Sequence, residues 1–496
     1  MDIDDPKASA DEDTRLSRRS VLKGLGALAA GTALAACSSS SKTATPPTTS
    51  STLPRSTSTT TPPIRKPGSL PNPSLPVGTD TMPQIEHIVV MMMENHSYDD
   101  HFGMLKRGDG FKLGADGLPI DANLYTEPGK LLKAFHMPST CQFPAVPSQA
   151  WPATHIAFDN GRNDGFVKAS GPVAMGYWDS TDIPFYYGLG QTFPVADRWF
   201  CSTLAQTYPN RRFLMAGTAA GIVKNNLATL TSRLPPNGTI FDRLDAHGIP
   251  WKNYYGDLPS AAIVPTSAIT PSKLAKNSQF IIDAAAGKLP AVSLVDPNFG
   301  QQSEENPQDI RQGERFAAAI INAAMQGPAW QKTLLIWTYD EHGGYYDHVP
   351  PPPAIKPDNI PPESDVAPLL PNGYDRYGFR VPAVIVSPYA KKNYVSHVVH
   401  DHTSVLKLIE TKWNLPALTY RDANADNLLD SLDFTAKPAF LDPPTLPAPA
   451  LPASTEVDDT ADAADHCSPG NPGGTIPPPS AIVPASEASK LRVGAT

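Results

Sequence analysis

Two pairs of adjacent polar residues, far apart in the chain, could together bind a divalent cation. Glu94-Asn95 directly follows one apolar run, and Asp340-Glu341 closely follows another. Acids at the end of a buried strand repel each other and lose hydration, so a cation satisfies them at the least cost. The alternative is that each pair only caps the following turn or helix. All-oxygen ligands favour Ca²⁺, Mg²⁺ or Mn²⁺, and Zn²⁺ also accepts carboxylates.

A hydroxyl and three histidines could supply the other groups of a hydrolytic site. Thr207 stands two residues before a Pro-Asn-Arg turn. A threonine hydroxyl becomes a useful nucleophile only when a metal or a base lowers its pKa, and the acid pairs could hold that metal. His155, His348 and His402 are candidate general acids or donors to phosphate oxygens. The alternative for each histidine is a structural role.

The surrounding pattern predicts an α/β domain with a largely parallel sheet. Across residues 83–437, short apolar runs bounded by Gly, Pro and Asn alternate with helical periodicity. We expect buried strands over residues 85–93, 333–337 and 381–386, and helices over residues 309–326 and 404–413. In open α/β sheets, ligands bind beyond the carboxyl ends of the strands. Both acid pairs fall at such ends.

Five motifs occur in a fixed order within residues 83–415. They are Glu94 to Asp99, Asn160 to Phe166, Thr207 to Arg211, Asp340 to Pro350, and Asp401 to Leu406. Together they resemble the bacterial phospholipase C and acid phosphatase family of the alkaline-phosphatase-like superfamily. The resemblance implies a doubly wound α/β core, with helices on both faces of the sheet. It also implies hydrolysis of a phosphate ester through a phosphoenzyme intermediate.

The resemblance also implies roles for individual residues. Thr207 would be both a metal ligand and the nucleophile, His155 lies where the family carries an active-site histidine, and His348 matches the histidine of an Asp-His-Val turn. The other metal ligands would be Glu94, Asn95, Asp340 and Glu341.

The chain departs from the family pattern at three places. His96 replaces an arginine, Tyr98 replaces a phenylalanine, and Asn306 precedes a proline where the family often has His-Pro. The absence of this phosphate-binding or proton-donating histidine bears on efficiency or substrate preference rather than on the reaction class. The family's larger phospholipases also carry additional C-terminal β domains, so toxin-like membrane attack is not inferred.

The shared motifs leave the ester class open. We expect a phospholipase C acting on phosphatidylcholine-type lipids, with an acid phosphatase acting on monoesters as the alternative and a catalytically inactive surface lipoprotein as a third. Two observations favour the phospholipase slightly: the predicted membrane anchor, and aromatic residues that could enclose a quaternary ammonium. These aromatic residues are Tyr186, Tyr187, Trp199, Tyr254, Tyr255, Tyr345 and Tyr346.

The first 37 residues indicate an export signal. Arg18-Arg19 precedes the apolar segment 25–36, which is shorter than the roughly 20 residues needed to span a bilayer. The segment ends in Leu-Ala-Ala followed by Cys37, which resembles a lipoprotein cleavage site. We therefore expect export by the twin-arginine machinery and a lipid anchor at Cys37 on the outer face of the cell membrane, or secretion as the alternative.

Composition divides and bounds the rest of the chain. Residues 38–82 form a Ser/Thr/Pro-rich linker, residues 83–437 the catalytic domain, and residues 438–496 a Pro/Ala-rich tail with little expected regular structure. A net charge of −9 argues against nucleic-acid binding.

The four cysteines lack zinc-site spacing. Cys141 and Cys201 could form a disulfide outside the cytoplasm, in which case Cys467 in the tail would have no disulfide partner among them. The oligomeric state stays open.

Overall fold

The structure is a computed structural model. It describes residues 63–142, 147–226, 232–266, 268–363, 373–451, 467 and 475–495. The predicted export signal, Cys37 and the linker up to residue 62 lie outside the described residues. The compact body begins at Arg65, earlier than the domain boundary that the sequence suggested. The backbone N–H of Gly68 donates to the carbonyl of Ala417 at 2.8 Å, and that of Thr81 to Lys412 at 2.7 Å. Residues 65–82 thus pack on the body.

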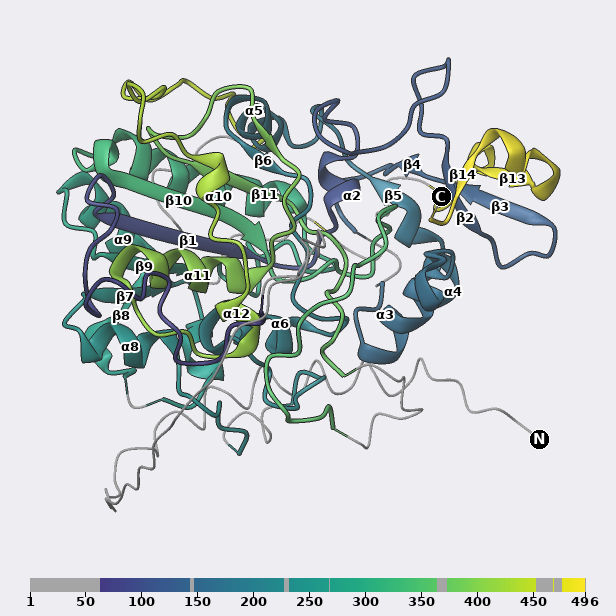
Figure 1. The fold of residues 1–496 in the computed structure, drawn as a ribbon. Helices are drawn as coiled ribbons and strands as arrows, with labels where there is room; N and C mark the ends of the chain where they lie inside the picture. The colour runs from purple at the N-terminus through teal and green to yellow at the C-terminus, as the bar shows by residue number, and fades with distance from the viewer. Residues whose placement is uncertain are drawn as a thin grey trace, which may run out of the picture. The chain divides into compact units, whose positions relative to one another are not determined.

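The centre of the fold is an eight-stranded sheet in the order β12-β6-β11-β10-β1-β9-β7-β8 (Figure 1). Its strands are β12 (Val395–Ser396), β6 (Val195–Ala196), β11 (Ala383–Val386), β10 (Thr333–Tyr339), β1 (His87–Met93), β9 (Val292–Asp296), β7 (Trp251–Tyr255) and β8 (Leu274–Lys276). Strand β1 is parallel to both its neighbours, β10 and β9, whereas β11 is antiparallel to β10 and β6. The predicted α/β fold with a largely parallel sheet is confirmed.

The register of the central strands brings three acids to one edge of the sheet. Met93, the last residue of β1, lies opposite Tyr339, the last residue of β10. Glu94 and Asp340 therefore leave the sheet side by side. On the other side of β1, β9 ends at Asp296, one residue after the pair formed by Met91 and Val295. The central strands are buried along almost their whole length, as expected for parallel strands covered on both faces.

The helices fall into two packed groups. The first contains α5 (Pro184–Thr192), α9 (Asn277–Ala285) and α10 (Ile310–Gln326). The second contains α6 (Thr207–Ala216), α8 (Ile240–Ala246), α11 (His402–Trp413) and α12 (Tyr420–Ala423). Both predicted helices are confirmed. Asp309 caps α10, and α11 begins two residues earlier than expected because Asp401 and Ser404 form a capping box.

Shorter elements connect these layers. They are α2 (Tyr98–Phe102), α3 (Trp151–Phe158), α4 (Phe166–Ser170), the paired strands β4 (Phe135–His136) and β5 (Gly176–Tyr177), and 3₁₀ turns at residues 159–161, 172–175, 260–263, 271–273, 330–332, 429–431, 479–481 and 485–490. None of the helices in the described ranges is long and apolar enough to cross a bilayer.

The C-terminal tail contributes to a second sheet, contrary to our expectation of little regular structure. The order of this sheet is β13 (Ile482–Pro484), β3 (Lys130–Lys133), β2 (Asp121–Leu124) and β14 (Arg492–Val493). Figure 1 shows the yellow tail strands beside β2 and β3. Segments of two or three residues are too short to give a periodic signal, and their pairing partners come from a remote part of the chain.

The suggested disulfide is wrong. Cys141 bonds to Cys467, with their Cα atoms 5.4 Å apart, and Cys201 is a buried free thiol. The thiol of Cys201 points at the carbonyl of Thr203, 3.5 Å away. Sequence spacing carries little information across a separation of 326 residues. The disulfide therefore ties the C-terminal tail to the body, a pairing that the sequence did not indicate.

Candidate active site

The two predicted acid pairs meet at the carboxyl ends of β1 and β10. Glu94 is 5% exposed, and Asp340 and Glu341 are fully buried. Asn95 has a left-handed backbone with φ of 73°, which turns the chain sharply after β1. Its backbone N–H donates to Oδ1 of Asp340 at 3.2 Å. A second sharp turn follows β10 at Gly343, which has φ of 67° and packs directly against the carbonyl of Asn95. The structure thus brings all four predicted ligands together.

The side chains of this cluster converge. With its amide oriented to satisfy its neighbours, Asn95 donates from Nδ2 to Oδ1 of Asp340 at 3.2 Å and to Oε1 of Glu341 at 2.6 Å. The amide thus bridges the two carboxylates, and its oxygen would turn toward them only with a cation bound among the three groups. Burial, followed by the charge of Asp340, raises the pKa of Glu341 well above its usual range. An all-oxygen, partly uncompensated donor set fits a hard divalent cation.

Arg211 provides a counter-charge that we did not predict. It is almost fully buried, and its Nε donates to Oδ2 of Asp340 at 3.0 Å. Its terminal nitrogens lie 3.2 Å from Oδ1 of Asp296 and 4.0 Å from Oε1 of Glu94. Arg211 therefore connects the ends of three neighbouring strands. Two signals could have identified it: an acid closing the buried run of β9, and an arginine four residues after Thr207.

Thr207 is the first residue of α6 and is 4% exposed. Residues four apart lie on the same face of a helix, so Thr207 and Arg211 point to the same side. Because Arg211 contacts Asp340, the face of α6 that carries Thr207 is the face turned toward the acids. The N-terminus of α6 also carries a partial positive charge, which favours a phosphate, although the N–H of Tyr208 in its first turn already donates to Oδ1 of Asn225 at 2.8 Å.

Asn210 explains why the motif around Thr207 contains an asparagine. Its Oδ1 accepts from the backbone N–H of Thr203 at 3.0 Å, and its Nδ2 donates to the carbonyl of Ala205 at 2.8 Å. The loop that precedes Thr207 is therefore fixed to the helix that Thr207 begins. One helix positions the hydroxyl, the counter-charge and the preceding loop.

His402 contacts the acid cluster through the backbone. Its Nε2 lies 2.7 Å from the carbonyl oxygen of Asp340, and a carbonyl can only accept, so Nε2 is the protonated nitrogen. Burial lowers the pKa of His402 to about 4, and the ring is neutral near pH 7. The geometry supports a positioning role for His402, and its predicted catalytic role stays a prediction.

His348 is the predicted histidine that is charged near neutral pH. Burial disfavours its charge, but the carboxylates of Asp99 and Asp109 outweigh burial and raise the pKa of His348 to about 9. Its Nδ1 lies 2.7 Å from Oδ2 of Asp99, and Arg380 donates to the other oxygen of Asp99 at 3.0 Å. His348 is thus a proton donor whose ring is held in one orientation.

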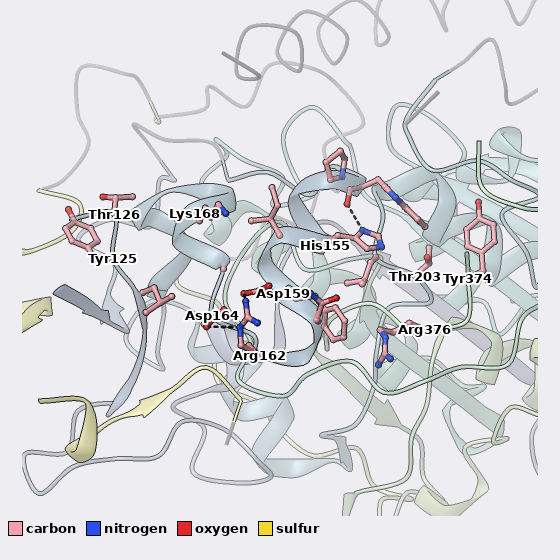
Figure 2. Close-up of a pocket in the computed structure, with 18 residues that line it drawn as sticks. Tyr125, Thr126, His155, Asp159, Arg162, Asp164, Lys168, Thr203, Tyr374 and Arg376 are labelled. Atoms are coloured by element: carbon pink, nitrogen blue, oxygen red, sulfur yellow. Dashed lines mark hydrogen bonds and ion pairs between the residues drawn. The ribbon is translucent and has the colours of Figure 1, made fainter. Parts of the chain in front are cut away.

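His155 lies on α3, at the wall of a cavity. Its Nδ1 lies 2.7 Å from the carbonyl of Trp151, which leaves Nε2 as the acceptor nitrogen of a neutral ring. Burial lowers the pKa of His155 to about 4. Figure 2 shows its bond to the backbone and its place between the two ends of the cavity. The contacts of His155 join it to the cavity rather than to the acid cluster.

The departures from the family pattern lie in a buried polar network. Nδ1 of His96 lies 2.6 Å from Oδ2 of Asp100, and its Nε2 lies 3.1 Å from the carbonyl of Glu304. Asn306 accepts from the hydroxyl of Tyr345 at 2.9 Å. His96 is buried and Asn306 is half-buried, whereas the hydroxyl of Tyr98, the third departure, donates to the carbonyl of Arg107 at 3.3 Å.

The suggested aromatic cage is wrong for most of its members. Tyr186, Tyr187, Trp199, Tyr254, Tyr345 and Tyr346 are at most 7% exposed and belong to the hydrophobic core. In the described part of the chain, the groups of three His, Cys, Asp or Glu residues whose ligand atoms lie within 4.8 Å of one another do not include Glu94, Asp340 or Glu341. They are His96, Asp100 and His101; Cys141, Asp309 and Cys467; Asp99, Asp347 and His348; His136, Asp179 and Asp182; and His400, Asp426 and Asp430.

Comparisons with known proteins identify the family of the chain. A model described as "Phosphoesterase family" matches residues 85–416. Phospholipase C A of Mycobacterium tuberculosis is 30% identical over 71% of this chain and 78% of its own length. Non-specific phospholipase C1 of Arabidopsis thaliana is 30% identical over 68% of this chain and 69% of its own length. A Vibrio parahaemolyticus protein of the alkaline phosphatase superfamily covers 66% of this chain and 77% of its own, at 12% identity and a TM-score of 0.33.

Proposed function

The chain belongs to the phosphoesterase family and is a phosphoric ester hydrolase, and on this premise we propose that it is a phospholipase C. Its substrate would be the phosphodiester of a phosphatidylcholine-type lipid. The observation that supports the proposal most directly is the contact of Arg211, on the helix that begins at Thr207, with Asp340 of the acid cluster. The phospholipase C names of the similar proteins support the diester over the monoester.

Glu94, Asn95, Asp340 and Glu341, together with the hydroxyl of Thr207, would hold one divalent cation. When bound, this cation would neutralise a phosphate oxygen and lower the pKa of the threonine hydroxyl. Ca²⁺, Mg²⁺, Mn²⁺ and Zn²⁺ all suit such a donor set. Arg211 holds Asp340 in place on the side away from Asn95.

The hydrolysis would take place in two displacements at phosphorus. Oγ of Thr207 loses its proton and bonds to phosphorus, while the bond from phosphorus to the lipid alcohol breaks. The departing alcohol takes a proton, and His348 is suited to give it because its raised pKa keeps the ring protonated near pH 7. Water then bonds to phosphorus, the bond to Thr207 breaks, and the phosphorylated head group leaves.

We propose that the protein acts on the outer face of the cell membrane. The twin-arginine motif and the cleavage site at Cys37 support export by the twin-arginine machinery and a lipid anchor. Replacing Cys37 by Ser should move the protein from the membrane fraction to the soluble exported fraction. Membrane association that is unchanged in Cys37→Ser would contradict the anchor.

The metal-loaded chain from residue 38 to 496, which keeps the whole compact unit, tests the proposed activity. It should cleave p-nitrophenyl phosphorylcholine, and Thr207→Ala should lose at least 100-fold, whereas Thr218→Ala, another buried threonine, should stay active. Cleavage of p-nitrophenyl phosphate alone would establish the acid phosphatase instead. No turnover of either ester with any of the four metals would favour the inactive lipoprotein.

A further inference from the structure

A cavity of about 750 Å³ lies between α3, α4 and the loop before α6 (Figure 2). Its volume falls within the range of small-molecule binding sites. Tyr125 and Thr126 lie at one end, and Tyr374 and Arg376 lie at the other. None of the residues that we place at the proposed reaction centre, other than His155, lines it.

Part of the cavity wall belongs to the loop that precedes the proposed nucleophile. Thr203 and Leu204 form part of its wall, and Asn210 of α6 holds their loop through the backbone of Thr203. Leu204 precedes Thr207 by three residues, so their Cα atoms are at most about 11 Å apart. The hydroxyl of Thr154 on α3 donates to the carbonyl of Leu204 at 2.7 Å, which fixes the opposite wall to the same loop.

The residues that line the cavity are apolar inside it, and both apolar and charged at its rim. The inner wall contains the buried side chains of Trp151, Phe158, Leu204 and Tyr374. Leu124 and Ile156 also line the cavity, yet they are 50% and 39% exposed, although water disfavours large exposed aliphatic side chains. Exposed aliphatic residues are common singly on protein surfaces; here two of them line the same apolar cavity.

The charges at the cavity disfavour a quaternary ammonium group. Arg162, Lys168 and Arg376 line it together with Asp159 and Asp164, and His155 is neutral, which leaves a net charge of about +1. Both acids are paired with Arg162, through Nε at 3.5 Å in the case of Asp164. Arg162 and Lys168 are exposed and can meet the phosphate groups of a membrane.

The C-terminal tail supports this rim. Strand β14 pairs with β2, which ends at Leu124, and the backbone N–H of Ala495 donates to the carbonyl of Arg162 at 2.7 Å. The apolar and the cationic parts of the rim are thus held by one strand and the residues after it. The rim is a built feature of the fold rather than a loose loop.

We propose that this cavity binds the acylglycerol part of the phospholipid, with Leu124 and Ile156 contacting the bilayer. The inference rests on the proposed function, since it names the site for the leaving alcohol of that reaction. It assigns the cavity to the lipid and not to the choline head group. A lipid bound in this cavity would have its glycerol end outside the membrane plane and closer to Thr207.

Rim variants with matched exposed controls test the proposal. Leu124→Glu and Ile156→Glu are compared with Leu234→Glu and Ile282→Glu, whose side chains are 64% and 58% exposed and do not line the cavity. Each metal-loaded protein, as residues 38–496, is assayed on phosphatidylcholine vesicles and on p-nitrophenyl phosphorylcholine, which has no acyl chain. Vesicle binding is measured separately by flotation in the Thr207→Ala background, which does not require turnover.

We expect the rim variants to lower the ratio of vesicle to soluble-ester hydrolysis at least tenfold and to reduce flotation, with both controls at the unmodified ratio. An unchanged ratio with unchanged flotation would overturn the proposal. An equal loss on both substrates would assign the cavity to the head group and would also overturn it. If the unmodified protein cleaves neither substrate, the proposed function fails, and loss of flotation in the rim variants would still establish the lipid surface.

Discussion

Replacing Arg211 by Met removes a cation that pairs with three buried acids, and this change tests the electrostatics of the site. The guanidinium contacts Asp340 at 3.0 Å and Asp296 at 3.2 Å and lies 4.0 Å from Glu94. Removing one partner of a buried ion pair costs about 3–5 kcal/mol, because the remaining charge stays buried without compensation. We therefore expect the metal-free variant to lose about this much unfolding free energy.

A bound divalent cation should reverse part of this loss. A ligand that binds only the folded state at 100 times its Kd adds about 2.7 kcal/mol to stability. Without Arg211 the acid cluster is more negative by one charge, so its affinity for a cation should rise. Metal should therefore stabilise Arg211→Met by more than it stabilises the unmodified protein.

Urea unfolding with and without Mg²⁺, Ca²⁺, Mn²⁺ or Zn²⁺ measures both effects. Arg212→Met is the matched control: it is the next residue on α6, is equally buried, and donates to the carbonyl of Ile263 at 3.0 Å. It should lose stability by an amount that metal does not restore. A loss below about 1 kcal/mol in Arg211→Met, or an equal gain from every metal in all three proteins, would refute the reasoning.

Three further predictions concern separate features. Because the pKa of His348 is raised to about 9, its protonation stabilises the folded state fully below pH 6.5, and this contribution is lost as pH rises through about 9. In urea unfolding, His348→Gln should therefore lower the unfolding free energy by up to about 3 kcal/mol at pH 6 and by little at pH 10. Gly343→Ala would place a Cβ 1.9 Å from the Asn95 carbonyl and should abolish hydrolysis, whereas Gly117→Ala, with φ of 77° and open space around it, should stay active. Cys467→Ser should cost about 2–4 kcal/mol, and reductant should destabilise only the protein with Cys467.

The sequence predicted the central strands and the acid pairs because these features are local. A buried strand followed by adjacent acids is visible in a short window, and the parallel register then brings Glu94 and Asp340 together. The helix capped by Asp309 was equally readable from its period and its cap. Signals of this kind depend only on neighbours in the chain.

Features that depend on remote partners were missed. Arg211 gains its role from Asp296, which reaches it from another strand, and neither residue is unusual on its own. The bond between Cys141 and Cys467 and the pairing of the C-terminal tail with β2 and β3 also join distant segments. The aromatic residues failed as a cage for the same reason, since burial is decided by packing and not by residue type.

Hydrolysis of phosphatidylcholine in ¹⁸O-labelled water is the most direct test of the central claim. The metal-loaded protein should release diacylglycerol without label and phosphocholine with one ¹⁸O atom, because water replaces Thr207 at phosphorus. Thr207→Ala should release neither product above background. Label in the alcohol, formation of phosphatidate and choline, or an undiminished rate in Thr207→Ala would contradict the account.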